Sequence, residues 1–155
     1  MKQRGGIKVV ANNRRARHDY ELLETFEAGI VLTGTEIKSV RGSKVSLQRS
    51  YVQNRDGQLW LMECHISPYE HAGYEQHDPT RPRKLLLHRR EINQIVDALQ
   101  LKGLTMVPTK MYLKDGWAKV EIALARGKKQ YDKRADLAKR DANRQVERAL
   151  REKYR

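Results

Sequence analysis

The sequence predicts a mainly β fold, a small closed antiparallel barrel with two or three short helices and a basic, helix-forming C-terminal tail. Three observations lead to this prediction. Short apolar runs of strand length recur through the middle of the 155-residue chain, two Asp-Gly dipeptides separate such runs, and helical periodicity is confined to one or two segments. Many short strands joined by tight turns are typical of antiparallel sandwiches and barrels.

The first part of the predicted barrel contains two short strands and a short helix. The strands are expected over residues 21–26 and 29–32, on either side of a Glu-Ala-Gly step. A helix is expected over residues 35–42, because Ile37 and Val40 are three positions apart. Gly42 can adopt the left-handed conformation that ends many helices.

The first hairpin follows. Val45, Leu47 and Tyr51 are expected to share one face of a strand, and residues 59–66 to form the return strand. The sequence Asn-Arg-Asp-Gly at 54–57 predicts the turn, because Asp-Gly accepts the positive φ angles that tight hairpins require. The polar residues 67–84, with three prolines, then predict a long loop, and loops of this length are usually functional or disordered.

An amphipathic helix precedes the second hairpin. Its apolar residues recur at i, i+3, i+4 and i+7, and Gly103 is placed to end it. These apolar residues are Ile92, Ile95, Val96 and Leu99. Residues 104–113 and 117–124 then form two strands across Lys-Asp-Gly at 114–116.

This set of elements fits a Greek-key barrel, so we expect an OB-like barrel over residues 13–126. We expect a mobile basic segment over residues 1–12 and a basic tail over residues 127–155. OB-type barrels often bind RNA, but a fold alone does not assign a function.

The positive charge of the chain is concentrated at its two ends. Residues 1–18 contain six Lys or Arg and no Asp or Glu, and residues 126–155 contain twelve against five. Residues 19–125 contain fourteen of each sign, so the net charge of +13 comes entirely from the ends. Such a distribution indicates a polyanionic partner, because binding of phosphates by Lys and Arg releases condensed counterions.

The tail is expected to be disordered when free and helical when bound. It lacks proline, but its apolar stripe is mostly alanine and gains little from burial. Like charges four residues apart each cost about 0.2–0.5 kcal/mol, which pairs of Asp136 with Arg140 and Glu147 with Arg151 partly offset. Phosphates bound along a row of arginines on one face would stabilise the helix instead. This row consists of Arg140, Arg144, Arg148, Arg151 and Arg155. The alternative is a solvated helix docked on the barrel.

Several classes of protein are disfavoured. A single cysteine, Cys64, excludes an internal disulfide framework and a cysteine-based zinc site, and its apolar surroundings predict a buried thiol. No apolar stretch approaches the roughly 18 residues of a membrane span, and the N-terminus does not resemble a signal peptide, so a cytoplasmic protein is expected. Nucleotide-binding and nucleophile-elbow motifs are absent, and no metal or cofactor is expected.

The histidines offer a weak alternative, a small RNA nuclease. His77 with Asp78, or His18, could serve as a general base. No helical histidine pair or carboxylate cluster accompanies them, so the sequence does not indicate an enzyme.

A basic segment before the first predicted strand is a candidate RNA contact. Residues 12–20 read NNRRARHDY and combine amides, guanidinium groups and an aromatic ring. Arginine can bind phosphate or stack on a base, and tyrosine can stack as well.

Five segments in order resemble the SmpB family of bacterial SsrA (tmRNA)-binding proteins. They are NRRARHDY at 13–20, EAGI at 27–30, GTEIKSVR at 34–41, DPTR with RKLLLH at 78–88, and GKKQYDKR at 127–134. The resemblance extends from about Val9 to the C-terminus. It implies an OB-like protein that binds the tRNA-like domain of tmRNA and completes a tRNA mimic in trans-translation.

The resemblance also implies two groups of functional residues. The group expected to contact or shape the tmRNA surface is Asn13, Glu27, Leu86, His88 and Lys119, to which the basic segment adds Arg14, Arg15 and Arg17. The group expected at the decoding centre and along the mRNA channel is Gly127, Lys128, Lys129, Tyr131, Asp132, Lys133 and Arg134, followed by Arg140, Arg144 and Arg148.

The implied partners are tmRNA, the stalled 70S ribosome with its small-subunit rRNA, and, through tmRNA, EF-Tu and alanyl-tRNA synthetase. A monomer is expected. The principal alternative is a basic ribosomal structural protein whose tail is permanently buried in rRNA.

Overall fold

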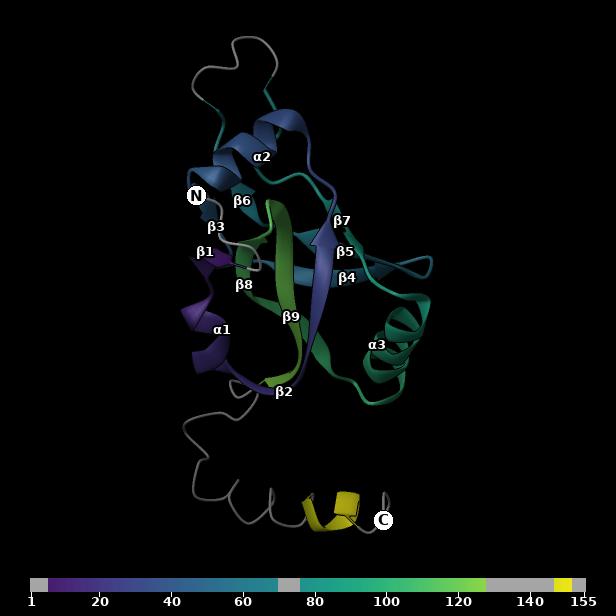
Figure 1. Ribbon diagram of the computed structural model, residues 1–155. Helices are drawn as coiled ribbons and strands as arrows, with labels where there is room; N and C mark the ends of the chain where they lie inside the picture. Colours follow the sequence, from purple (N-terminus) through teal and green to yellow (C-terminus); the bar gives the residue numbers. More distant parts are fainter. Residues whose placement is uncertain (1–5, 70–75, 128–146, 152–155) are drawn as a thin grey trace.

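The computed structural model describes residues 6–69, 76–127 and 147–151. A strongly curved antiparallel sheet forms the body, and three helices pack around it (Figure 1). The strands are β1 (Ile7–Asn12), β2 (Tyr20–Ile30), β3 (Val45–Ser46), β4 (Tyr51–Arg55), β5 (Gln58–Met62), β6 (His65–Ile66), β7 (Arg83–Leu86), β8 (Thr105–Lys114) and β9 (Trp117–Gly127). The helices of the body are α1 (Arg14–Asp19), α2 (Gly34–Arg41) and α3 (Arg89–Leu101).

The main sheet is open, so the prediction of a closed barrel is wrong. Seven strands pair in the order β1-β8-β9-β2-β7-β5-β4, and β3 pairs with β6 in a separate two-stranded sheet. Closure would require hydrogen bonds between β8 and β4, but β1 already pairs with Lys110–Lys114 of β8. Earlier on the same strand, Asn13 donates to the Pro108 carbonyl from its side chain and to the Thr109 carbonyl from its backbone.

The edge of β8 therefore has few groups left for another strand. Proline also lacks the N–H group that a ladder needs. β4 lies close to β8 without pairing, and a cleft of about 640 Å³ lined by α1, β4 and β8 lies at this seam.

Both Asp-Gly turns form as predicted, but the strand before the first turn is Tyr51–Arg55 and does not extend back to Leu47 and Val45. Asp56 and Gly57 have φ angles of 51° and 80°, and Asp115 and Gly116 have φ angles of 52° and 83°. Two consecutive positive φ angles are the requirement of the turn type that matches the twist of a two-residue hairpin.

Four predicted details differ in the structure. One strand, Tyr20–Ile30, with a bulge between Leu22 and Glu24, replaces the two strands expected over residues 21–26 and 29–32. The return strand 59–66 is interrupted at Glu63, whose φ of 57° separates β5 from β6. Gly42 ends α2 with a φ of −85°, and the left-handed residue is Ser43. Residues 7–12, which were expected to belong to a mobile segment, pair with β8 as β1.

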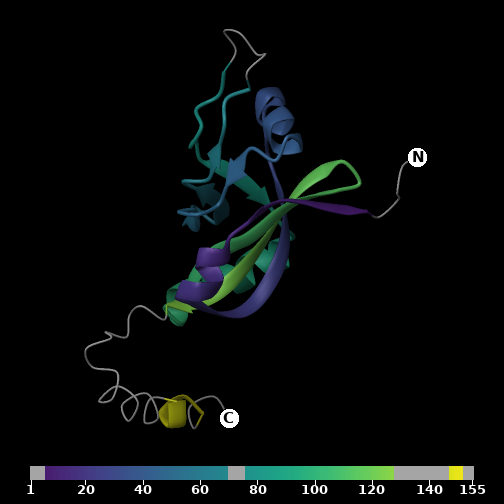
Figure 2. The ribbon, with the colours of Figure 1, turned by 90° about the vertical axis from the view of Figure 1, so that its left-hand side faces the viewer.

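Helices α1 and α3 pack on opposite faces of the sheet (Figure 2). The apolar face of α3 joins the main core, where Ile92 and Ile95 are buried with Phe26 and Ile122, and this confirms the predicted amphipathic helix. On the other face, Ala16 of α1 is buried with Val107 and Ala125.

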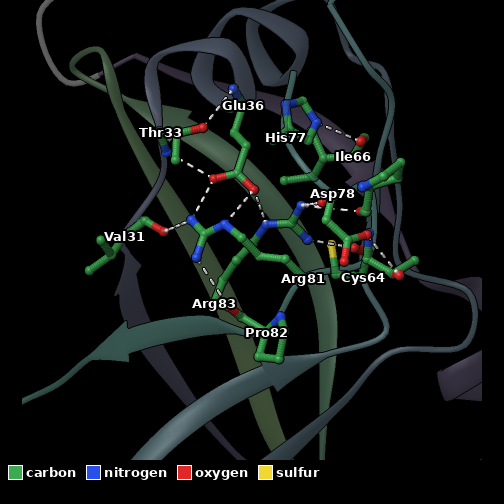
Figure 3. Close-up of polar contacts among 12 residues, drawn as sticks. Val31, Thr33, Glu36, Cys64, Ile66, His77, Asp78, Arg81, Pro82 and Arg83 are labelled. Carbon is green, nitrogen blue, oxygen red and sulfur yellow. Dashed lines mark hydrogen bonds and ion pairs between the residues drawn. The ribbon is translucent and has the colours of Figure 1, made fainter. Parts of the chain in front are cut away.

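Helix α2 is attached to the sheet by a buried ionic network (Figure 3). The Glu36 carboxylate is fully buried and accepts from Arg83 Nε at 2.6 Å and from Arg81 at 2.6 Å and 3.2 Å. Arg83, also fully buried, donates further to the carbonyl of Cys64 at 2.6 Å. Because Arg83 is the first residue of β7, this network fixes the strand that ends at Leu86.

Candidate nucleic-acid interface

The side of the sheet that faces away from the main core carries most of the predicted RNA-binding residues. The strand registers place Tyr112 of β8 opposite Lys119 of β9, Lys119 opposite Gly29 of β2, and Gly29 opposite Leu86 of β7. The next row contains Lys110, Glu121 and Glu27. We call this surface the open face, defined by Glu27, Gly29, Leu86, Lys110, Tyr112, Lys114, Lys119 and Glu121.

Gly29 forms a floor without a side chain between Lys119 and Leu86. A Cβ atom at this position would lie 3.4 Å from Leu86 Cβ. The absence of a side chain therefore leaves the backbone uncovered between Lys119 and Leu86. Leu86 is 51% exposed, although it is an apolar residue in a strand. The row therefore offers a flat backbone strip with a lysine on one side and an exposed leucine on the other.

Glu27 is held in place by hydrogen bonds to two neighbours. The Tyr112 hydroxyl donates to Glu27 Oε2, and Lys114 Nζ lies 3.5 Å from the same oxygen. The hydrogen bond from Tyr112 lowers the pKa of Glu27, more than desolvation raises it, and the nearby lysines add to the effect. Burial, followed by the hydrogen bond to Glu27, raises the pKa of Tyr112. The proton therefore stays on the tyrosine, and the carboxylate is ionised at neutral pH.

Among the remaining polar groups of the open face, Lys110 and Glu121 have partners and Lys119 does not make a hydrogen bond within the described residues. Lys110 Nζ lies 5.6 Å from the centre of the Tyr112 ring, a cation–π distance. The Thr109 hydroxyl donates to Glu121, whose carboxylate is thus turned toward β8. Lys119 makes no hydrogen bond within the described part of the chain, and its ammonium group is available to a ligand.

The arginines of α1 lie on the same side of the sheet. The buried contacts of Ala16 with Val107 and Ala125 seat the helix there, because these strand residues share the parity of Glu121 and Lys119. The outward residues Arg14, Arg15 and Arg17 are exposed. Arg15 Nε lies 3.4 Å from Asp19 in an i,i+4 pair, which leaves the helix with a positive surface.

Asn13 is placed differently from the other predicted contacts. Its side chain is 4% exposed and caps α1, because Oδ1 accepts from the Ala16 N–H at 3.2 Å. Its amide also donates to the Pro108 carbonyl at 2.9 Å. Asn13 therefore shapes the surface by positioning α1, while its own polar atoms are used inside the protein.

His88 lies at the N-cap of α3, two residues beyond Leu86, and is exposed. Its backbone N–H donates to Glu91 Oε1 at 3.3 Å. His88 therefore follows directly after β7, two residues beyond the end of the row that Leu86 closes.

Most of the predicted ribosome-contacting residues lie outside the described residues. They are Lys128, Lys129, Tyr131, Asp132, Lys133, Arg134, Arg140 and Arg144. Gly127 is the last residue of β9 and pairs with Tyr20. Arg148 is exposed within the helical residues 147–151, where Glu147 and Arg151 form the predicted pair at 3.9 Å.

The candidate nuclease histidines are engaged in other contacts. His77 Nε2 donates to the Ile66 carbonyl at 2.8 Å, and its Nδ1 lies 2.9 Å from the Thr35 hydroxyl. Asp78 accepts from Thr80 rather than pairing with His77. His18 lies 3.0 Å from Asp19 on the exposed side of α1.

Three further findings concern the described residues. They contain no group of three or more His, Cys, Asp or Glu that could hold a metal ion. Cys64 is buried, as predicted, and burial raises the pKa of its thiol to about 12. Among these residues, no helix has the length and apolar character needed to cross a membrane.

Sequence reasoning missed three features of the interface. Tyr112 was not assigned a role, although it orients Glu27 from 85 residues away. Gly29 belongs to the EAGI segment, which carries no signal for its place between Lys119 and Leu86. Trp117, at the tip of the second hairpin, is 73% exposed and pairs with Lys114, which in turn pairs with the exposed Ile7. An exposed tryptophan beside a lysine could have been noticed as a candidate contact from the sequence.

Comparisons with known proteins agree with the resemblance. A relative from Roseiflexus sp. (strain RS-1), named SsrA-binding protein, is 58% identical over 96% of this chain and 94% of its own length. One of the same name from Nostoc punctiforme (strain ATCC 29133 / PCC 73102) is 55% identical over 94% of each chain. A solved structure described as "tmRNA-SmpB: a journey to the center of the bacterial ribosome" matches with a TM-score of 0.66 and 53% identity, over 79% of this chain and 86% of that one. The family described as SmpB protein matches residues 10–152, and the chain therefore belongs to the SmpB family.

Proposed function

We propose that this chain binds the tRNA-like domain of tmRNA and completes a tRNA mimic that acts on stalled ribosomes in trans-translation. The observation that carries the proposal is the open face. Glu27, Leu86 and Lys119 are far apart in the sequence, and all three were assigned to RNA by the family resemblance alone. They lie on three adjacent strands around Gly29. The names of the relatives and of the similar structure support the same partner.

The distribution of positive charge also supports RNA binding at the open face. The exposed arginines of α1 lie on the side of the sheet that also carries Lys110, Lys114 and Lys119. Phosphates bound at these groups would release counterions, which makes the affinity dependent on salt. We propose that α1 and the lysines hold the RNA backbone, while Glu27, Leu86 and His88 contact specific groups.

The binding test compares two lysine variants. Lys119→Ala should weaken binding to the tRNA-like domain and reduce the slope of log K against log salt by about 1. Lys102→Ala is the matched control, because Lys102 is an exposed lysine that ends α3 on the other side of the sheet. Equal affinities and slopes for the two variants would refute the assignment of the open face to RNA.

The tail is proposed to act on the ribosome rather than on tmRNA. Its net charge of +7 over residues 126–155 suits rRNA lining an empty mRNA channel. We place Gly127, Lys128, Lys129, Tyr131, Asp132, Lys133 and Arg134 at the decoding centre, and Arg140, Arg144 and Arg148 along the small-subunit rRNA. EF-Tu and alanyl-tRNA synthetase would act through tmRNA, and the protein would work in the cytoplasm as a monomer.

A truncation separates these two roles. Because β9 continues to Gly127 and buries Ala125 against Ala16, the chain should be cut after Gly127. The truncated protein should keep its affinity for the tRNA-like domain and lose tagging of nascent chains on ribosomes stalled without a stop codon. A tenfold or greater loss of RNA affinity would show that the tail also holds tmRNA.

The two alternative functions, a ribosomal structural protein and an RNA nuclease, predict different experimental results. A ribosomal structural protein would remain with purified idle subunits at high salt, whereas a rescue factor would be recruited only by tmRNA and a stalled ribosome. A nuclease would cleave RNA, and His77→Ala would abolish the cleavage. The contacts of both ring nitrogens of His77 favour a structural role for this residue.

A further inference from the structure

A carboxylate on a phosphate-binding surface requires an explanation. Glu27 is 41% exposed in the middle of the open face, and its charge would repel the phosphates that the neighbouring lysines attract. A negative side chain at such a position favours binding only where the ligand supplies hydrogen-bond donors to it. Bases and ribose hydroxyls are the donors that RNA offers.

The acceptor capacity of Glu27 is only partly used. Oε2 accepts from the Tyr112 hydroxyl and lies 3.5 Å from Lys114 Nζ, whereas Oε1 has no hydrogen bond within the described part of the chain. An ionised carboxylate has about four lone-pair positions, so positions remain on both oxygens. The lowered pKa of Glu27 keeps these positions as acceptors at neutral pH.

The orientation of Glu27 is fixed before any ligand arrives. Tyr112 lies two strands away on β8, and its ring is largely covered, so its hydroxyl holds the carboxylate from a rigid position. A group held in this way loses little conformational entropy on binding. The carboxylate thus discriminates between ligands by the pattern of donors that they present.

The residues around Glu27 leave a flat surface that suits a planar base. Gly29 follows Glu27 on the same face of β2 and leaves the backbone uncovered between Lys119 and Leu86. Leu86 offers an exposed apolar side chain at the end of this strip, and Lys119 a cation at the other. A planar base could lie over the glycine, with its edge toward Glu27 and its phosphate toward Lys119.

We propose that Glu27 reads the Watson–Crick edge of an unpaired guanine. Among the four standard bases, only this edge presents two neighbouring N–H donors, N1–H and N2–H, which match the two oxygens of a carboxylate. The amino groups of adenine and cytosine lie beside ring acceptors that would face the carboxylate, and the N3–H of uracil is flanked by two carbonyls. The inference rests on the proposed binding of tmRNA and names the base that this part of the site recognises.

Inosine interference tests the proposal, because inosine lacks only the N2 amino group of guanosine. A pool of tRNA-like-domain RNAs with inosine at random guanine positions is bound to the protein, and the bound and free fractions are mapped. With the unaltered chain, inosine should be depleted on the order of tenfold from the bound fraction at one guanine, or a few, with an unpaired Watson–Crick edge. With Glu27→Ala, the depletion at that position should disappear.

Two further variants sharpen the test. Tyr112→Phe keeps the carboxylate but removes the group that orients it, so the depletion at the same guanine should be reduced without being lost. Glu21→Ala removes an exposed carboxylate elsewhere on β2 and should leave the pattern unchanged. Thermal unfolding of each variant shows whether the fold is retained.

The possible results distinguish a failure of the guanine assignment from a failure of the proposed tmRNA binding. An inosine pattern that is identical with and without Glu27 would overturn the guanine assignment while leaving tmRNA binding intact. Suppression of 2′-deoxy interference instead of inosine interference by Glu27→Ala would also overturn it, in favour of a ribose contact. Failure of the unaltered chain to bind the RNA would refute the proposed function itself.

Discussion

Arg83 and Glu36 form a fully buried ion pair, with Nε of the arginine 2.6 Å from Oε2 of the carboxylate. The pair joins α2 to the first residue of β7, the strand that presents Leu86 to the open face. The guanidinium group is otherwise surrounded by backbone carbonyls, including those of Cys64 and Pro79. Removal of the carboxylate therefore leaves a buried cation without its counter-charge.

We expect Glu36→Gln to destabilise the fold by about 3–5 kcal/mol, because breaking a buried pair leaves one charge uncompensated. Urea denaturation of this variant and of Glu21→Gln provides the comparison, since Glu21 is an exposed carboxylate of β2. A loss for Glu36→Gln no larger than that for Glu21→Gln would show that the network adds no net stability.

The same pair predicts the response of the fold to acid. Burial would raise the pKa of Glu36, but hydrogen bonds from Arg81, Thr33 and Arg83 together hold it below its ordinary value of 4.5. A carboxyl whose pKa is lower in the folded state stabilises the fold above the unfolded pKa, and this stabilisation is lost as the pH falls through the folded pKa. The free energy of unfolding should therefore decline below about pH 4.5, and less steeply in Glu36→Gln. Parallel curves for the two proteins would contradict this assignment.

Asn13→Ala should destabilise α1 and, through it, RNA binding. The cap is worth about 0.5–2 kcal/mol, and the Pro108 carbonyl loses its donor as well. Asn13→Asp separates the two effects, because it keeps the capping oxygen and removes the amide donor. Hydrogen exchange of residues 14–19 measures the helix directly. Unchanged exchange in Asn13→Ala would show that packing of Ala16 alone holds α1 in place.

Gly29→Ala should weaken binding to the tRNA-like domain several-fold while leaving the melting temperature nearly unchanged. The added Cβ would lie 3.4 Å from Leu86 Cβ, which is an ordinary contact, but it would cover the floor of the site. Gly34→Ala is the control, because no atom lies within 4 Å of the added methyl group there. Unaltered affinity in Gly29→Ala would place the RNA elsewhere on the protein.

Trp117 provides a spectroscopic test of the open face. In a Trp60→Phe background it is the only tryptophan, and its indole is 73% exposed beside Lys114. Binding of the tRNA-like domain should change its emission, since bases that stack on an indole quench it. Tight binding measured by filter retention, without any change in emission, would exclude this end of the hairpin from the interface.

Local signals predicted the elements that depend on local interactions. Asp-Gly at 56–57 and 115–116 specified both hairpins, because the φ requirement of a tight turn is a property of those residues themselves. The apolar period from Ile92 to Leu99 likewise specified α3. The six residues of α1 carry no such period, and their only signal was the capping residue Asn13.

Features that depend on distant contacts were not predictable in this way. The open sheet follows from the use of the β8 edge by β1 and by Asn13, which lies 95 residues from Pro108. For Glu27, the family resemblance supplied a role, but its partner Tyr112 lies on another strand. Residue types alone did not show that the only residue between Lys119 and Leu86 would be a glycine.

The pairing of Tyr20 with Gly127 places the end of α1 beside the last residue of β9. Tyr20 ends α1, and the chain continues from Gly127 directly into Lys128. Arg17 therefore lies three residues before the strand pair that ends at Gly127, although more than a hundred residues separate the two in sequence. Repulsion between the positive charges of α1 and of the tail is relieved when phosphates occupy either side. We therefore expect RNA bound along α1 to ease the approach of the tail to a second RNA, so that tmRNA and rRNA are recognised as electrostatically coupled ligands.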